Sequence, residues 1–368
     1  MSNQDESTLV PPDDNTVRRI RKLEQSLAAE RISRRDAERK LKQAESDLQL
    51  AEHELTAMLH MNDRATLRSY KPSGSSHDRG KATAIICVND WHAEQTVEPD
   101  LVGGINEFSA DIADARIART WEQAIYLIDF AKRISNIDEV VLWAGGDLMN
   151  GMIHDEYLQT NWAGPTDAAQ FVQDHLVSGI QKLVAEIPCD RFKFLATHGN
   201  HGRSTPDKRV HTQYAHSWER LIYHNVAKSI SDCPKVSSYI ERGPLLHAEI
   251  QGVRCRFSHG DTIKYLGGQS GVIGPASRAR QAWDQQHGEA ALTVIAHFHQ
   301  YISTQNFVCC GSLIGFDPFA QAIKAQAEPP TQTLIVLDSK RGKVLTIPIF
   351  CESKIYAQTG WTTPKVGT

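Results

Sequence analysis

Beyond residue 82, the chain alternates short apolar runs rich in β-branched residues with longer segments of helical periodicity. This alternation is typical of an α/β protein, in which helices cover buried strands. The last predicted strands have no helices between them, so we do not expect a purely parallel sheet. The predicted strands are residues 83–88, 140–144, 192–197, 245–250, 253–258, 292–296, 301–308, 333–337 and 344–349, and the predicted helices are residues 110–134, 167–186 and 213–229.

A segment near the N-terminus, residues 17–61, contains no glycine or proline and consists mainly of good helix formers. In a heptad frame, ten of its twelve a and d positions are apolar. A narrow apolar stripe on a polar helix favours a coiled coil over packing on the chain's own globular part. We therefore expect a homo-oligomer through this helix. The a positions are Ile20, Leu27, Arg34, Leu41, Leu48 and Leu55, and the d positions are Leu23, Glu30, Ala37, Ala44, Ala51 and Met58.

These patterns divide the chain into five parts. We expect a disordered leader at residues 1–15, a coiled-coil helix at 16–61, a polar linker at 62–81, an α/β domain at 82–352 and a tail at 353–368. The seven cysteines are scattered without a Cys-x-x-Cys pair, which favours free thiols in a reducing compartment. Because no apolar run is long enough to span a bilayer, the expected location is the cytoplasm.

The charge balance limits the kinds of partner. The chain has 40 Lys and Arg against 44 Asp and Glu, a formal net charge of −4. A non-specific nucleic-acid binder needs a basic excess, because its affinity comes mainly from neutralising phosphates. Any recognition of phosphate must therefore be local.

Five of the predicted strands are each followed by a cluster of polar residues. Taken singly, such a cluster is weak evidence, because it is often an ordinary turn. The strands of an α/β sheet place their carboxyl ends at a common edge, where ligands usually bind, so we expect the five clusters to converge. They are Asp90-Trp91-His92, Gly146-Asp147, Gly199-Asn200-His201, Ser258-His259-Gly260-Asp261 and His297-Phe298-His299.

The side chains in these clusters select a chemistry. Carboxylates and imidazoles without thiolates suit manganese, iron or zinc. Two such ions, about 3.5–4 Å apart, can hold a phosphoryl oxygen and turn a bridging water into hydroxide. The sequence therefore favours a pair of divalent ions, most simply manganese.

The order Asp-x-His, Gly-Asp, Gly-Asn-His, His and His-x-His resembles the calcineurin-like metallophosphoesterase superfamily over residues 83–350. The resemblance implies an αββα sandwich, in which two packed mixed β-sheets are flanked by helices. It also implies a role for each matching residue. The first metal would be held by Asp90, His92 and His299, the second by Asn200, His259 and His297, with Asp147 bridging both and His201 acting as the catalytic histidine.

Two positions depart from the family pattern. Ala296 stands where the last motif usually begins with glycine. Gly202 and Arg203 follow the Gly-Asn-His triplet, where the family usually has an acidic residue. We expect Arg203 to contact a phosphate through its planar guanidinium, the alternative being a surface ion pair.

Several neighbouring residues keep two interpretations. His154 and His198 are expected either to orient the ligands or to be ordinary loop residues. Trp91 and Phe298 are expected to pack beneath the metals, with base stacking as the alternative. The glycine-rich run at residues 267–271 is interpreted as a mobile loop.

The predicted function is therefore a dinuclear metal-dependent phosphodiesterase that acts on nucleic acid by attack of metal-bridged hydroxide. Two histidines in the last motif are similar to the repair-exonuclease and phosphodiesterase branches of the superfamily. The helical arm and the Gly-Asn-His-Gly-Arg motif are also similar to phosphoesterases encoded by bacteriophages. The alternatives are a phosphomonoesterase acting on a small phosphate or a phosphoprotein, and a non-catalytic coiled-coil assembly protein with a vestigial metal site.

Overall fold

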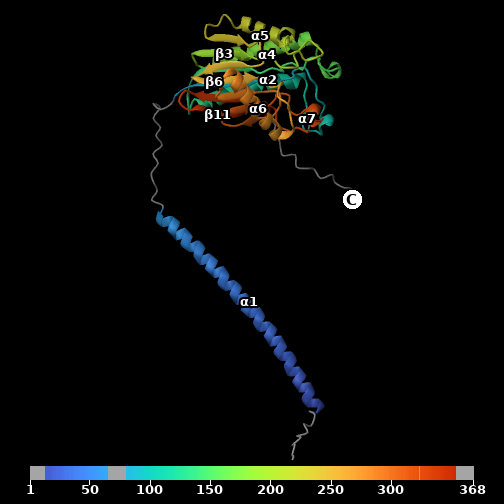
Figure 1. Ribbon diagram of the computed structural model, residues 1–368, viewed down its shortest axis with the longest axis vertical. Coiled ribbons are helices and arrows are strands. Elements are labelled where there is room, and N and C mark those ends of the chain that lie inside the picture. Colours follow the sequence, from blue (N-terminus) through green and yellow to red (C-terminus); the bar gives the residue numbers. More distant parts are fainter. Residues whose placement is uncertain (1–12, 65–79, 323, 354–368) are drawn as a thin grey trace, which may run out of the picture. The chain divides into compact units, whose positions relative to one another are not determined.

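The computed structural model describes residues 13–64, 80–322 and 324–353. Its first element is α1 (Asp14–Arg64), a single helix of 51 residues (Figure 1). The long N-terminal helix is thus confirmed, while its pairing into a coiled coil stays a prediction. Most of the predicted leader, linker and tail lies outside the described residues. Within the described ranges, no helix is both long and apolar enough to span a membrane.

The first of two sheets has six strands in the order β11-β10-β1-β2-β3-β4. Strands β1 to β4 are parallel to one another, and β10 and β11 add antiparallel pairs, so the sheet is mixed, as expected. The strands are β1 (Lys81–Val88), β2 (Asn136–Ala144), β3 (Arg191–Ala196), β4 (Val236–Ile240), β10 (Thr331–Asp338) and β11 (Gly342–Phe350).

The second sheet has five strands in the order β5-β6-β7-β9-β8. Its middle strands, β6, β7 and β9, are parallel, and the two outer strands pair with them in the antiparallel direction. The strands are β5 (Leu246–Ile250), β6 (Val253–Ser258), β7 (Leu292–Ile295), β8 (Ile302–Ser303) and β9 (Phe307–Cys309).

Helices cover the outer face of each sheet and produce four layers (Figure 1). The strands of the first sheet are buried on both faces, as the alternating side chains of β1 show. Ala84 and Ile86 pack toward the helices, and Ile85 and Cys87 pack toward the second sheet. This architecture of two packed mixed sheets flanked by helices confirms the predicted fold class. The helices on the first sheet are α2 (Ala110–Ala131), α4 (Pro165–Glu186) and α5 (Trp218–Ser229), and the helix on the second is α6 (Gly268–His287).

The remaining helical elements are short. They are η2 (Pro99–Val102), α3 (Tyr157–Thr160), η3 (Tyr214–His216) and α7 (Pro318–Ala322). The first of these has Pro99 as its first residue, where the missing N–H costs nothing, and ends at Gly103 in a left-handed conformation.

Three predictions about local structure were wrong. Residues 301–308 form two strands, β8 and β9, because the chain turns back between Ser303 and Phe307 and pairs with itself. The run at residues 267–271 is not a loop: helix α6 begins at Gly268, and Val272 and Ala276 bury its inner face against the second sheet. Strand β4 was not predicted, because its polar sequence lacks an apolar run.

Candidate metal centre

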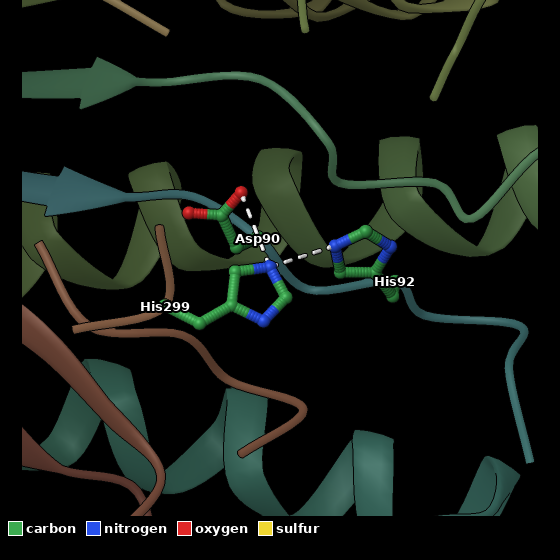
Figure 2. Close-up of side chains that lie close together, drawn as sticks. All are labelled: Asp90, His92 and His299. Carbon is green, nitrogen blue, oxygen red and sulfur yellow. Dashed lines mark hydrogen bonds and ion pairs between the residues drawn. The ribbon is translucent and has the colours of Figure 1, made fainter. Parts of the chain in front are cut away.

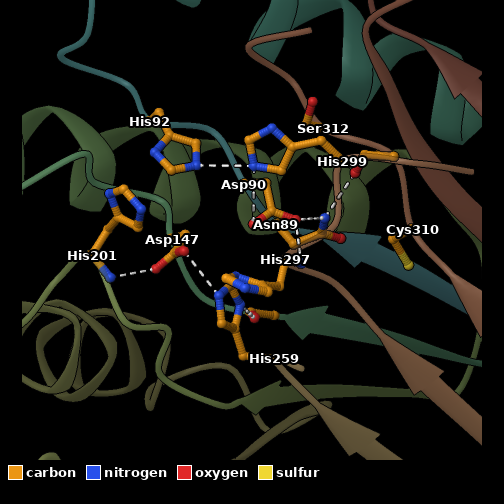
Figure 3. Close-up of polar contacts among 12 residues, drawn as sticks. Asn89, Asp90, His92, Asp147, His201, His259, His297, His299, Cys310 and Ser312 are labelled. Carbon is orange, nitrogen blue, oxygen red and sulfur yellow. Dashed lines mark hydrogen bonds and ion pairs between the residues drawn. The ribbon is translucent and has the colours of Figure 1, made fainter. Parts of the chain in front are cut away.

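The seven predicted metal ligands and the predicted catalytic histidine lie together at the carboxyl ends of five strands (Figure 3). The loops that follow β1, β2 and β3 of the first sheet supply most of them, and the loops after β6 and β7 of the second sheet supply the rest. The structure therefore brings together every residue that was predicted as a metal ligand. The eight residues are Asp90, His92, Asp147, Asn200, His201, His259, His297 and His299.

One group of predicted ligands consists of Asp90, His92 and His299 (Figure 2). The Nε2 atoms of His92 and His299 are 3.2 Å apart, and His299 Nε2 is 3.7 Å from Asp90 Oδ1. Asp90 Oδ1 is buried and finds no hydrogen-bond partner among the residues that the structure describes. A buried carboxylate oxygen without a donor is costly, so this arrangement suits a cation shared by the three side chains.

A second group consists of Asp147, His259 and His297. His259 Nε2 lies 2.8 Å from Asp147 Oδ2 and 3.2 Å from Asn200 Oδ1. Asp147 also forms a group with His92 and His201, so its carboxylate lies between the two ligand sets. This position fits the bridging role that the family resemblance implies.

Hydrogen bonds fix which nitrogen two of the imidazoles present to the site. His92 Nδ1 lies 3.1 Å from the side-chain oxygen of Asn150, and His259 Nδ1 lies 2.8 Å from the carbonyl oxygen of Gly145. Both partners are acceptors, so each Nδ1 carries the proton and donates it. Nε2 is then the nitrogen of each ring that faces the site, and it is the one available to bind a metal.

The electrostatic environment keeps most of these imidazoles neutral. Burial lowers the pKa of His297 to about 4 and that of His299 to about 3, with charge on neighbouring histidines adding to the effect. Burial opposes ionisation of Asp147, but His259 and His201 hold its pKa well below the usual value. His259 is the exception, because Asp147 outweighs burial and raises the pKa of its imidazole to about 10. The other imidazoles are neutral nitrogen donors beside a charged carboxylate, which is a donor set that divalent cations favour.

The backbone is strained at the ligands. Seven described residues other than glycine have positive φ, and five of them are predicted ligands. Such conformations cost about 1–3 kcal/mol each and persist where the surrounding structure holds them, typically at functional sites. The five are Asp90 (φ 48°), His92 (45°), Asp147 (52°), His297 (72°) and His299 (54°).

Two glycines allow the loops after β2 and β3 to touch. Gly146 has φ +90°, and a Cβ there would lie 2.3 Å from Gly199 N. A Cβ on Gly199 would lie 2.1 Å from Asp147 Oδ1. Any side chain at either position would therefore push Asp147 away from the histidines.

Three buried residues that support the ligands were not predicted. Asn150 binds His92 through its side chain and accepts a hydrogen bond from His201 Nδ1 through its carbonyl, at 3.0 Å. Glu94 accepts from the backbone N–H groups of Asn150 and Gly151, at 2.8 and 2.7 Å. Both lie within three residues of a ligand in the sequence, which was a signal that could have found them.

The third is Glu219, at the start of α5. Its two carboxylate oxygens accept from Leu148 N at 2.8 Å and from Gly199 N at 2.7 Å, so one side chain joins the loops after β2 and β3. Burial raises its pKa to about 8, and these two donors favour its charged form. It follows His201 by 18 residues, and no motif marks it.

Replacing Glu219 with glutamine should loosen the site without removing a ligand. One acceptor becomes a donor that faces a backbone N–H, which costs about 1–3 kcal/mol of stability. Metal affinity should fall about 10–100-fold, as for other residues that orient ligands. Metal titration and thermal unfolding measure both effects, with Glu122→Gln on the exposed face of α2 as the control. Unchanged metal affinity would limit Glu219 to a role in folding.

Arg203 lies on the wall of the cavity beside the ligands. Its guanidinium donates to the carbonyl oxygens of Asn200, Thr205 and Pro206, at 2.8, 3.2 and 3.2 Å, and so ties its own loop together. In the described part of the chain it forms no ion pair, and its contact with a phosphate stays a prediction.

The structure gives different surroundings to the other residues that had two interpretations. Neither His154 nor His198 forms a side-chain hydrogen bond to a predicted ligand within the described ranges, although His154 lines the cavity. Trp91 is fully buried, stacks edge-on against Trp121 and donates to Gln332, so it does not face a ligand. Phe298 is nearly buried and lines the cavity.

Comparisons with known proteins add little to this geometry. No family model matches the chain, and no curated protein matches it. Among solved structures, the chain is similar to Vps29 from Entamoeba histolytica in complex with Zn²⁺. That similarity has 11% identity and a TM-score of 0.26, and it covers 49% of this chain and 89% of Vps29. A hypothetical protein from Thermus thermophilus is similar at 10% identity and a TM-score of 0.23, covering 73% of this chain and 97% of that protein. Similarities this weak carry no argument about function.

Proposed function

We propose that this protein is a dinuclear metal-dependent phosphodiesterase, with nucleic acid as the preferred class of substrate and manganese as the preferred metal. The observation that carries the proposal is the placement of Asp147 between two groups of ligands. When bound, two divalent ions supply a water activated near neutral pH and positive charge for the phosphoryl oxygens. The donor set fits iron and zinc as well.

The residues of the chain have distinct parts in this proposal. Asp90, His92 and His299 hold one ion, and Asn200, His259 and His297 hold the other. Asp147 serves both. Five of these residues also line a cavity that gives a phosphodiester access to the ligands, namely His92, Asp147, Asn200, His297 and His299.

His201 is the proposed proton donor to the leaving oxygen. Its Nδ1 lies against the carbonyl of Asn150, so Nε2 is the nitrogen that remains for a substrate in the cavity. Its backbone N–H donates to Asp147 Oδ1 at 2.7 Å, which fixes its position relative to the bridging carboxylate. Burial lowers the pKa of His201, and the Asp147 carboxylate opposes that shift by favouring the protonated form, which can neutralise the oxygen that departs.

Removal and return of metal test the proposal. Chelation should abolish hydrolysis of bis-p-nitrophenyl phosphate, and manganese should restore it with two ions per chain by elemental analysis. The diester should be a better substrate than p-nitrophenyl phosphate. A faster monoester reaction would favour the phosphomonoesterase alternative, and activity that persists without metal would contradict the proposal.

The non-catalytic alternative is not favoured by the site. An idle cluster of buried carboxylates and imidazoles costs folding free energy, and the strained backbone at five ligands adds to that cost. A vestigial site would be expected to lose ligands first, yet all seven predicted ligands lie within the cluster.

We also propose that α1 pairs with α1 of a second copy in parallel. Its seam residues are exposed, including Leu41 at 61% and Leu48 at 60%. Parallel pairing in register would place Arg19 of one copy opposite Glu24 of the other, and Lys40 opposite Glu45, across positions g and e.

Replacing Leu41 and Leu48 together with aspartate should dissociate the oligomer, because it places like charges in the seam. Light scattering measures the mass, and bound metal should be unchanged. The matched control is Ile32→Asp with Leu50→Asp, which changes two exposed apolar residues of α1 outside the seam. An unchanged mass in the seam variant, or dissociation of the control as well, would contradict pairing through this face.

A further inference from the structure

The cavity beside the ligands has a second wall that the proposed chemistry does not use. The cavity has a volume of about 350 Å³, which is within the range of small-molecule sites. Beyond the metal ligands, much of its lining is apolar and aromatic. The residues of this wall are Ile153, Tyr157, Tyr265, Phe298 and Phe319.

Three aromatic residues of this wall, Tyr265, Phe298 and Phe319, line the cavity together with the ligands. Tyr265 and Phe298 lie with their ring centroids 6.0 Å apart and tilted by 37°. The Tyr265 hydroxyl accepts from Gly268 N at 2.8 Å, which holds its ring at the start of α6. Phe319, on α7, is 65% exposed and lines the same cavity. An exposed aromatic ring at the mouth of a site is characteristic of a binding surface.

The charges on the cavity wall are few. Apart from the ligands and histidines, the charged side chains that line it are Arg203 and Asp317. The wall therefore lacks the row of lysines and arginines that follows a nucleic-acid backbone. Affinity for the part of the substrate beyond the phosphoryl group must come from contact with flat apolar surfaces.

We infer that Tyr265, Phe298 and Phe319 form a stacking subsite for the nucleobase next to the scissile phosphodiester. This inference rests on the proposed phosphodiesterase function and adds a substrate class, a nucleoside phosphodiester. Every base has a π face, so stacking on aromatic rings binds nucleotides without a sequence preference. His299 follows Phe298 directly, so the subsite adjoins the ligands and a single nucleotide can reach both.

Two diesters with the same leaving group isolate the contribution of the base. One is the p-nitrophenyl ester of thymidine 5′-monophosphate, and the other is methyl p-nitrophenyl phosphate, which has no base. Both are assayed with the full-length protein loaded with manganese. Hydrolysis of neither ester would contradict the proposed function itself, whereas hydrolysis of the methyl ester alone or of both esters equally well would contradict only the stacking subsite.

The variants are Phe319→Ala and Phe319→Trp, with Phe130→Ala on α2 as an exposed aromatic control away from the cavity. Phe319→Ala should lower kcat/KM for the thymidine ester about 5–150-fold, mainly through KM, and leave the methyl ester within about twofold. Phe319→Trp should retain the thymidine reaction. Calorimetric titration with thymidine 5′-monophosphate should show the same loss of affinity in Phe319→Ala.

The results separate stacking from other effects. Equal losses on both esters would show that Phe319 supports the fold or the leaving group, and no loss on either would leave the ring without a role; both results overturn the subsite.

A single-stranded oligothymidylate distinguishes the source of the base. Its cleavage with the same dependence on Phe319 supports a subsite for a strand, and cleavage of the mononucleotide ester alone supports one for small nucleotides.

Discussion

Replacing Asp147 with alanine is expected to abolish turnover and to remove at least one metal per chain. The carboxylate lies in two of the three ligand groups, and its oxygens also contact His259 and the backbone N–H of His201. Loss of several kcal/mol of transition-state stabilisation corresponds to about 10³-fold or more in rate. Steady-state kinetics and elemental analysis measure the two effects.

A second substitution separates chemistry from folding. Asp147→Asn keeps the shape of the side chain and removes its negative charge, so this variant should fold and still lose metal. It tests the bridging role even if the alanine variant does not fold. Asp155→Asn, on the exposed part of the same loop, is the matched control and should behave as wild type. Two metals still bound in Asp147→Asn would rule out the bridging role.

Replacing His201 with asparagine should keep both metals and lower turnover about 10²–10⁴-fold, the usual contribution of general acid–base catalysis. The metals should remain because the two groups proposed to hold them, Asp90 with His92 and His299 and Asp147 with His259 and His297, do not include His201. The loss should be large for a substrate with an alkoxide leaving group, which needs a proton, and small for a nitrophenyl ester, which does not. Kinetics on the two kinds of ester give the comparison.

His154→Asn is the control for this experiment. His154 also lines the cavity, but its side chain makes no hydrogen bond to a ligand in the described part of the chain. Its substitution should leave the dependence on leaving group unchanged. If His201→Asn slowed both esters equally, the histidine would act by positioning and not by proton transfer.

The sequence predicted the central strands of the sheets better than the edge strands. Strands such as β1 and β2 contain apolar runs rich in β-branched residues, because a central strand is buried on both faces, and such a run is visible in the sequence. Strand β4 is polar and, among the described strands, pairs with β3 alone, so no apolar pattern marks it. Helix α6 begins at glycines that ordinarily disfavour a helix, and packing of Val272 against the second sheet outweighs that preference.

In the candidate site, too, the sequence marks some residues and not others. Ligands that end strands stand in short motifs, so the sequence could group Asp90 with His92 and His297 with His299. The supporting residues carry no such signal. Glu219 is defined by which two backbone N–H groups it meets, and those come from loops that only the folded chain brings together.

The division of the ligands between the two sheets has a consequence for folding as well as for catalysis. Bound ions would cross-link two layers that otherwise meet through the apolar side chains between them and a few hydrogen bonds, such as that from His259 to Gly145. A ligand that binds only the folded state adds about 4 kcal/mol at a concentration 1,000 times its dissociation constant. The melting temperature of this domain would then depend on the metal concentration. Chains without metal would unfold more often, and proteolysis would remove them.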